Sequence, residues 1–209
     1  MWSRWARFEC SVAIWVLACI TSCSISRQYP IKHHYGLYVE RPAVASTDGA
    51  AARAIALRVA HFSASSSSEG VELIYRRSDQ EYEADFYHEY FKPPAQLIEQ
   101  AARKWLSESS LYATVLPAGS QIVTPWLLEG HLGAMYGDFR DAKAPRGVLE
   151  MEFLLLREHE GDPAIVLHRT YHEEQAISAA TPAALVDGLR QALARSLARL
   201  ETDLRAAKE

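Results

Sequence analysis

Residues 149–155 read Leu-Glu-Met-Glu-Phe-Leu-Leu, an apolar series interrupted at every second position by Glu150 and Glu152. A period of two places the apolar side chains on one face of a β-strand and the carboxylates on the other. The following turn, at 158–163, contains Gly-Asp and is too short for a crossover connection. We therefore expect segment 165–171 to pair antiparallel with this strand.

The same reasoning extends to the residues on either side. Segment 126–136 also alternates and is joined to residue 149 by a short charged turn, which predicts a second antiparallel pair. Pro93-Pro94 and Thr181-Pro182 are typical helix starts, because proline fits the first turn and threonine caps it. Apolar stripes with helical spacing then predict helices over 94–109 and 182–206.

The remaining segments indicate further strands. Alternation or short β-rich runs predict strands at 35–39, 54–62, 71–75, 81–91 and 111–116. The serine-rich residues 63–70 are expected to form a flexible connection with almost nothing to bury. The order of strands and helices predicts an α+β fold, in which a mixed, largely antiparallel sheet packs against two helices.

The N-terminus has the pattern of a lipoprotein signal peptide. Arg4 and Arg7 precede an apolar run from Ser11 to Ile20, and small residues then lead to Cys23. The run is too short for a membrane-spanning helix, which needs about 20 apolar residues, but it suits a signal segment. We expect cleavage before Cys23 and acylation of that cysteine.

Cys19 is an alternative lipid-attachment site, although the small residues Thr21 and Ser22 favour Cys23. The predicted organisation is a signal peptide over 1–22, a lipidated tether over 23–33 and an α+β domain over 34–209. Two or more acyl chains give stable attachment to a membrane. Because Ser24 replaces the aspartate common in retained bacterial lipoproteins, we expect the periplasmic face of the outer membrane.

Composition limits the classes of partner. The net charge is −4, which gives no basic field for nucleic acid. The three cysteines all lie in the first 23 residues, so the mature chain has only the lipidated one and no internal disulfide.

Catalytic and metal-binding patterns are weak. His172-Glu173-Glu174 resembles a zinc-protease motif, but position 176 is alanine where the second histidine would stand. A nucleophile elbow and glycine-rich phosphate loops are absent from the sequence. Glu150 and Glu152 share a face and could work as an acid–base pair, although a solvated charged face is the preferred interpretation. We expect no enzyme activity, no metal and no cofactor.

An aromatic cluster in segment 82–91 is the candidate binding surface. With regular alternation, Phe86 and Tyr90 share one face with Tyr82, while Tyr87 and Phe91 share the other. One face would pack on the helices and the other would meet a partner or lipid, since exposed apolar patches mark such sites. The residues singled out for this surface are Tyr82, Tyr87, Tyr90 and Phe91. An ordinary core with a few exposed tyrosines is the alternative, and part of the last helix could be an oligomer contact.

Several segments together resemble the ABC-type transport auxiliary lipoprotein family. They are Gly70-Val-Glu-Leu-Ile-Tyr-Arg-Arg-Ser-Asp79, Tyr82 to Ala95, Trp105 to Ser110, Leu128-Glu-Gly130, Tyr136-Gly-Asp-Phe-Arg140, Val148 to Leu155 and Leu200 to Leu204. The similarity runs from about residue 35 to the C-terminus, behind the lipoprotein signal. A relative in this family is the paraquat-inducible outer-membrane lipoprotein.

The resemblance implies an auxiliary subunit of an ABC transport system for phospholipid or other hydrophobic molecules. Such proteins act with a substrate-binding protein of the mammalian-cell-entry type and have no catalytic residues. The paraquat-inducible relative assembles as a ring, which leaves a homo-oligomer open for this chain. The alternatives are a scaffold or outer-membrane assembly lipoprotein and, less favoured, a lipid-modifying hydrolase.

Overall fold

An antiparallel meander of long strands forms one side of the sheet, with β9 at its edge. β7 (Trp126–Asp138) pairs with β8 (Arg146–His159), which pairs in turn with β9 (Asp162–Ala176). The structure, a computed structural model, describes residues 31–42, 53–159 and 162–207. Within it, Lys32–Glu209 form one compact unit, to which the fold belongs. The antiparallel pairing predicted from the short turns is confirmed.

The second edge of β7 is shared by short strands that follow one another along the chain. All are parallel to β7 and pair with successive parts of it: β2 (Arg53–Val59), β3 (Ser63–Ala64) and β4 (Glu72–Arg76). The sheet then extends beyond these strands. Parallel β6 (Tyr112–Leu116) joins β2, antiparallel β5 (Tyr82–Tyr90) joins β4, and parallel β1 (His33–Tyr35) joins β5. β2 therefore lies at the start of β7, and β4, β5 and β1 lie at its end.

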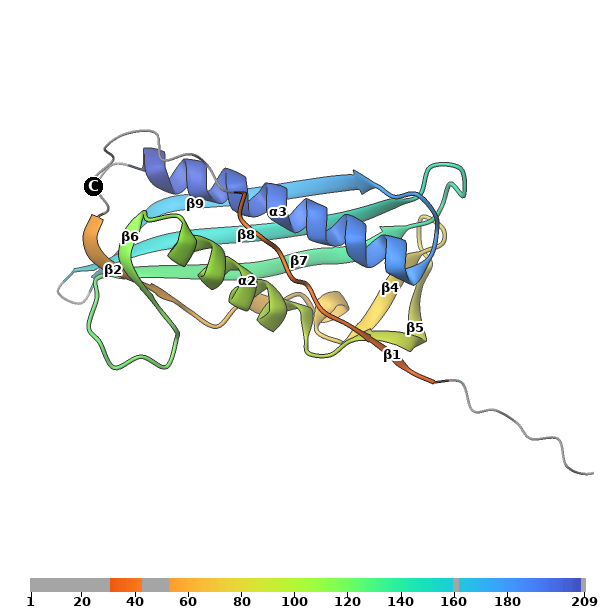
Figure 1. The fold of residues 1–209 in the computed structure, drawn as a ribbon, viewed down its shortest axis with the longest axis horizontal. Helices are drawn as coiled ribbons and strands as arrows, with labels where there is room; N and C mark the ends of the chain where they lie inside the picture. Colours follow the sequence, from red (N-terminus) through yellow and green to blue (C-terminus); the bar gives the residue numbers. More distant parts are fainter. Residues whose placement is uncertain (1–30, 43–52, 160–161, 208–209) are drawn as a thin grey trace, which may run out of the picture. The chain divides into compact units, whose positions relative to one another are not determined.

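Helices α2 (Pro94–Glu108) and α3 (Pro182–Ala206) cover the same face of this sheet (Figure 1). Each begins at a proline as predicted, and the Thr181 hydroxyl accepts a hydrogen bond from the Ala184 backbone N–H at 3.4 Å. The predicted fold class, a mixed and mostly antiparallel sheet packed against two helices, is confirmed. We call the other side of the sheet, opposite α2 and α3, the open face. In the described part of the chain no helix is both long and apolar enough to cross a membrane.

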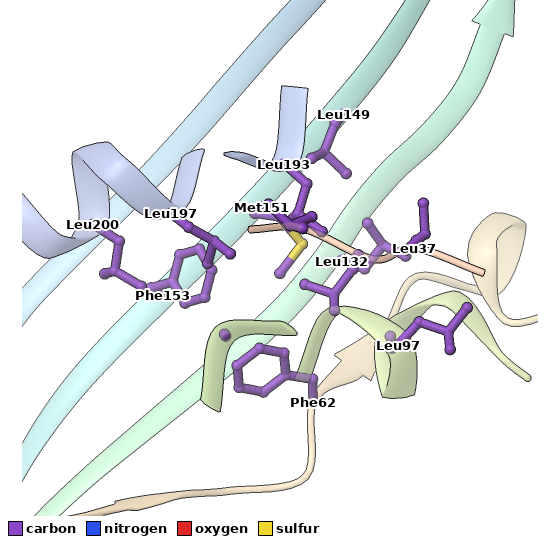
Figure 2. Packing of buried hydrophobic residues seen from close by; sticks show 14 of the residues in the cluster. Leu37, Phe62, Leu97, Leu132, Leu149, Met151, Phe153, Leu193, Leu197 and Leu200 are labelled. Carbon is purple, nitrogen blue, oxygen red and sulfur yellow. The ribbon is translucent and has the colours of Figure 1, made fainter. Parts of the chain in front are cut away.

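The core lies between the helices and β7–β8 (Figure 2). Met151 and Phe153 point from the sheet toward Leu193 and Leu197 of α3, and Leu132 lies beside Met151 in the same cluster. All five are at most 1% exposed. Because each buried leucine-sized side chain contributes about 1.5–3 kcal/mol, this layer makes a large contribution to the stability of the fold.

The serine-rich connection is more ordered than predicted. It forms β3 and a short 3₁₀ helix, Ser66–Ser68. The hydroxyls of Ser63 and Ser65 contact the two ring nitrogens of His131 at 2.8 and 3.1 Å. The prediction of a flexible connection is wrong, because these side chains are held by hydrogen bonds that a hydrophobicity pattern does not register.

Phe62, directly before this connection, is buried over Gly130 of β7. A Cβ at position 130 would lie 2.8 Å from the Phe62 ring, so only glycine allows the ring to settle there. The ring then packs edge-on against Phe153, with centroids 5.8 Å apart. The aromatic contact fixes the start of the serine-rich segment to the core.

Residues 36–42, which we call the N-terminal strap, cross the helices (Figure 1). Strand β1 ends at Tyr35, so the strand predicted over 35–39 is wrong beyond its first residue. Leu37 and Val39 are instead buried in the core cluster. Arg41 then makes a two-pronged ion pair with Glu201 of α3, with both N–O distances 2.8 Å.

The Glu201 carboxylate joins three parts of the fold. Besides Arg41, it accepts a hydrogen bond from Trp105 Nε1 of α2 at 2.9 Å and one from Arg205 at 3.0 Å. The hydrogen bond from Arg41 contributes most to lowering the pKa of Glu201, and burial opposes it. The strap, α2 and α3 are therefore held by one nearly buried anion.

We predict that Glu201→Gln lowers the free energy of unfolding by about 1–3 kcal/mol, because it leaves the partly buried Arg41 without its main counter-charge. Urea unfolding at neutral pH measures this change. Glu83→Gln is the control, since Glu83 is 54% exposed in its ion pair with Arg77, away from the Arg41–Glu201 pair. That change should cost less than about 0.5 kcal/mol. Equal effects of the two substitutions would contradict the role of Glu201.

The difference between the Glu201→Gln variant and the native protein should also depend on pH. A carboxyl whose pKa is lowered by folding stabilises the folded state above its ordinary pKa, about 4.3, and this contribution is lost as the pH falls through the folded pKa. The two free energies of unfolding should therefore converge below about pH 4. A constant difference between pH 7 and pH 3 would contradict this assignment.

Candidate functional site

A bulge in β5 presents Phe86, the most exposed aromatic side chain of this strand, together with Tyr87. On β4, residues 72 and 74 are two positions apart, but their partners on β5, Glu89 and Ala84, are five apart. The extra residues of β5 leave the regular ladder between these two pairs. Bulges of this kind redirect side chains that would otherwise alternate.

Asp85 holds the bulge in place. Its Oδ1 accepts hydrogen bonds from the backbone N–H groups of Tyr87 and His88, at 2.9 and 3.1 Å. Its Oδ2 accepts one from the Tyr75 hydroxyl at 2.6 Å and contacts His88 Nδ1 at 2.9 Å. Burial alone would raise the pKa of Asp85, but the hydrogen bonds from Tyr75, Tyr87 and His88 outweigh it and lower that pKa. The carboxylate is thus stabilised in its charged form.

Phe86 and Tyr87 project from this bulge. Phe86 is 67% exposed and Tyr87 40%, and their rings meet edge to face with centroids 5.1 Å apart. The ammonium of Lys32 lies 4.8 Å from the centre of the Phe86 ring, within the range of a cation–π contact. We call these three residues the aromatic bulge.

Tyr90 does not belong to an exposed surface, which corrects the prediction that included it. It is 4% exposed and packs in the core. Regular alternation would put it on the same face as Phe86, but the bulge lies between them and changes the register. Burial raises the pKa of the Tyr90 hydroxyl far above its ordinary value. The side chain borders a small cavity of about 190 Å³ beneath the serine-rich segment.

The other predicted aromatic residues are exposed, and each has a different neighbour. The Tyr82 ring, 51% exposed, lies edge-on to Tyr136 of β7 at 5.5 Å. Phe91, 43% exposed, stacks on Tyr38 of the strap at 6.4 Å. Sequence reasoning therefore found exposed aromatic residues here but omitted Phe86, which is more exposed than any of the four that it named.

Cys23 lies outside the described residues, so its prediction as the lipid-attachment site stays a prediction.

The open face of the sheet carries the carboxylates Glu150 and Glu152. Their side chains are 43% and 37% exposed. Glu150 contacts His172 Nδ1 at 3.2 Å, and Glu152 contacts His168 Nε2 at 2.6 Å. These cross-strand pairs between β8 and β9 give a charged, solvated face, as preferred from the sequence. Among the described residues, no group of three or more His, Cys, Asp or Glu is arranged to hold a metal ion.

A cleft of about 490 Å³ opens between the β4–β5 and β7–β8 turns. Its charged lining residues are Arg77, Asp79, Asp138, Arg140, Asp141 and Arg146. These charges balance, and the arginines are engaged in ion pairs. For example, Arg140 contacts Asp138 at 2.8 Å and Asp79 at 2.5 Å. The cleft therefore has no excess positive charge with which to bind an anion.

Comparisons with known proteins show a shared fold. No protein-family model matches the chain, and no curated protein sequence is similar to it. The crystal structure of protein XCC0632 from Xanthomonas campestris, of family DUF330, is similar with a TM-score of 0.68 and 19% identity, over 80% of this chain and 92% of that one. A crystal structure of an uncharacterized protein has a TM-score of 0.64 and 19% identity, over 83% of this chain and 99% of that one.

We predict that Asp85→Ala destabilises the protein by about 1–3 kcal/mol, because it removes the acceptor for Tyr75 and for two backbone N–H groups. Urea unfolding measures the loss, and the amide NMR signals of Tyr87 and His88 should shift. Glu83→Ala is the control on the same strand, since Glu83 is 54% exposed in its ion pair with Arg77. A loss no larger than that of Glu83→Ala would show that Asp85 does not hold the bulge.

Proposed function

We propose that this chain is a lipid-anchored periplasmic auxiliary subunit of an ABC-type transport system, linked to a mammalian-cell-entry-type protein. Its substrates would be phospholipid or other hydrophobic molecules. The observation that carries the proposal is the lipoprotein signal ending at Cys23, followed by the ordered set of segments that resemble the auxiliary lipoprotein family. The domain would act at the outer membrane by docking or binding rather than by catalysis.

Contacts between the resembling segments support the proposal. Phe139 of the 136–140 segment stacks on Tyr75 of the 70–79 segment, with ring centroids 5.1 Å apart. Arg140 of the same segment contacts Asp79 at 2.5 Å. Two of the seven stretches on which the resemblance rests therefore meet at the end of the sheet formed by β4 and β5. Residues that form one structural unit are a stronger basis for resemblance than scattered matches.

Tethering supplies the physical mechanism. Acyl chains at Cys23 would hold the domain at a membrane surface and raise its effective concentration near a membrane-bound partner. Exposed aromatic side chains such as Phe86 and Tyr82 offer large contact areas with little conformational freedom to lose. Docking by this route needs no bound cofactor and no metal.

We predict that Cys23→Ala abolishes membrane retention and leaves the fold intact, because residue 23 precedes the compact unit that begins at Lys32. Fractionation of cells after a salt wash measures retention. Cys19→Ala is the matched control and should remain in the membrane fraction. Retention of the Cys23→Ala variant after the wash, or loss of the Cys19→Ala variant, would contradict lipid attachment at Cys23.

Crosslinking in intact cells tests the transport proposal itself. Affinity purification followed by mass spectrometry should recover a mammalian-cell-entry-type protein together with phospholipid. Recovery of only cell-wall or barrel-assembly proteins would favour the scaffold alternative. Labelling of the purified protein by a serine-reactive probe would instead favour a hydrolase.

A further inference from the structure

We infer that the aromatic bulge, Lys32, Phe86 and Tyr87, contacts the surface of the lipid bilayer in which the acyl anchor is inserted. The inference rests on the proposed lipid attachment at Cys23 but not on the transport function. It gives the domain a defined orientation on the membrane, with the β1–β5 end of the sheet toward the lipid.

The chemistry of the bulge suits a bilayer interface. Phe86 exposes two-thirds of its surface, and Tyr87 adds a ring with a polar end. The Lys32 ammonium lies over the Phe86 ring, 4.8 Å from its centre, on a side chain that is 43% exposed. Membrane-surface segments combine aromatic residues with lysine in this way, because the rings enter the headgroup region while the ammonium stays at the phosphates.

A second aromatic pair extends the same edge. Phe91 and Tyr38 stack just beyond the last β1–β5 register pair, and the ammonium of Lys92 lies 5.9 Å from the Phe91 ring. Both lysines thus accompany exposed rings. Because Lys32 is paired with Glu89 at 2.9 Å, Lys92 is the cation of this edge that anionic lipids would attract.

The carboxylates near the bulge are engaged within the protein. Glu89, with a side chain only 12% exposed, contacts Lys32 at 2.9 Å and His34 at 3.4 Å. Asp85 is occupied by the hydrogen bonds that hold the bulge. The charge of Glu89 is therefore balanced by Lys32, and the Asp85 carboxylate, with a side chain only 15% exposed, is turned mostly away from solvent.

The length of the tether favours the bilayer as the surface that the aromatic bulge contacts. Nine peptide steps separate Cys23 from Lys32, so an extended chain keeps Lys32 within about 30 Å of the acylated residue. Strand β8 has 14 residues and at about 3.3 Å per residue spans roughly 45 Å. The end of the sheet at which the tether meets the domain is therefore confined near the bilayer. Lys32, where the tether meets the domain, is itself part of the aromatic bulge.

Tryptophan fluorescence in the acylated full-length protein tests the inference. In residues 23–209 the native tryptophans are Trp105 and Trp126, at most 3% exposed, so a new surface tryptophan is a clear reporter. Phe86→Trp and Tyr87→Trp place it at the bulge. Val123→Trp is the control, because Val123 is 93% exposed in the loop that leads into Trp126, at the other end of β7. The proteins are reconstituted into phosphatidylethanolamine–phosphatidylglycerol vesicles with brominated acyl chains.

The expected result is that all variants float with the vesicles and that bromine quenches both bulge reporters several-fold more strongly than the Val123→Trp reporter. Equal quenching of floating variants would overturn the inference and leave the anchor standing, and the bulge would then be assigned to a protein partner. Failure of the native protein to float would overturn the lipid attachment and the inference with it.

Discussion

The ion pair between Arg41 and Glu201 fixes the course of the N-terminal segment, on which the functional account depends. One carboxylate receives Arg41 from the strap, Trp105 from α2 and Arg205 from its own helix. Leu37 and Val39 are buried along the way. The strap is held at Arg41, and β1, which precedes it, pairs with β5. These two contacts fix Lys32 as the point at which the chain enters the domain.

A second carboxylate determines what is displayed at that point. Asp85 accepts two backbone and two side-chain contacts, which makes the irregular part of β5 a defined structure rather than a frayed edge. In a regular strand, Phe86 and Tyr87 would point to opposite faces of the sheet, and one of the two rings would face the helices and be buried. The bulge exposes both rings next to Lys32, where the chain enters the domain. The exposed rings and the proposed tether are therefore at the same end of the domain.

Most of the fold could be predicted from local patterns, because short turns and amphipathic stripes carry that information. The meander β7–β9 and both helices follow from alternation, turn length and the Pro93-Pro94 and Thr181-Pro182 starts. The parallel pairing of β2, β3 and β4 with β7 joins residues far apart in the chain, and no short-range pattern encodes it. The order of the serine-rich segment depends on His131, more than sixty residues away.

Only part of the candidate site could be predicted, and the reason is similar. The abundance of aromatic residues in β5 indicated a surface, but the assignment of faces assumed strict alternation. Asp85, three residues after the start of β5, was the only local signal of a bulge, since aspartate often bonds the backbone two residues ahead. Without that correction Tyr90 is placed outside and Phe86 is missed.

The intact mass of the protein extracted from membranes is the decisive test of lipid attachment. Acylation at Cys23 predicts a mature chain that begins at Cys23 and carries the added mass of a diacylglyceryl group and an N-linked acyl chain. An unmodified Cys23, or a chain that retains residues 1–22, would contradict it.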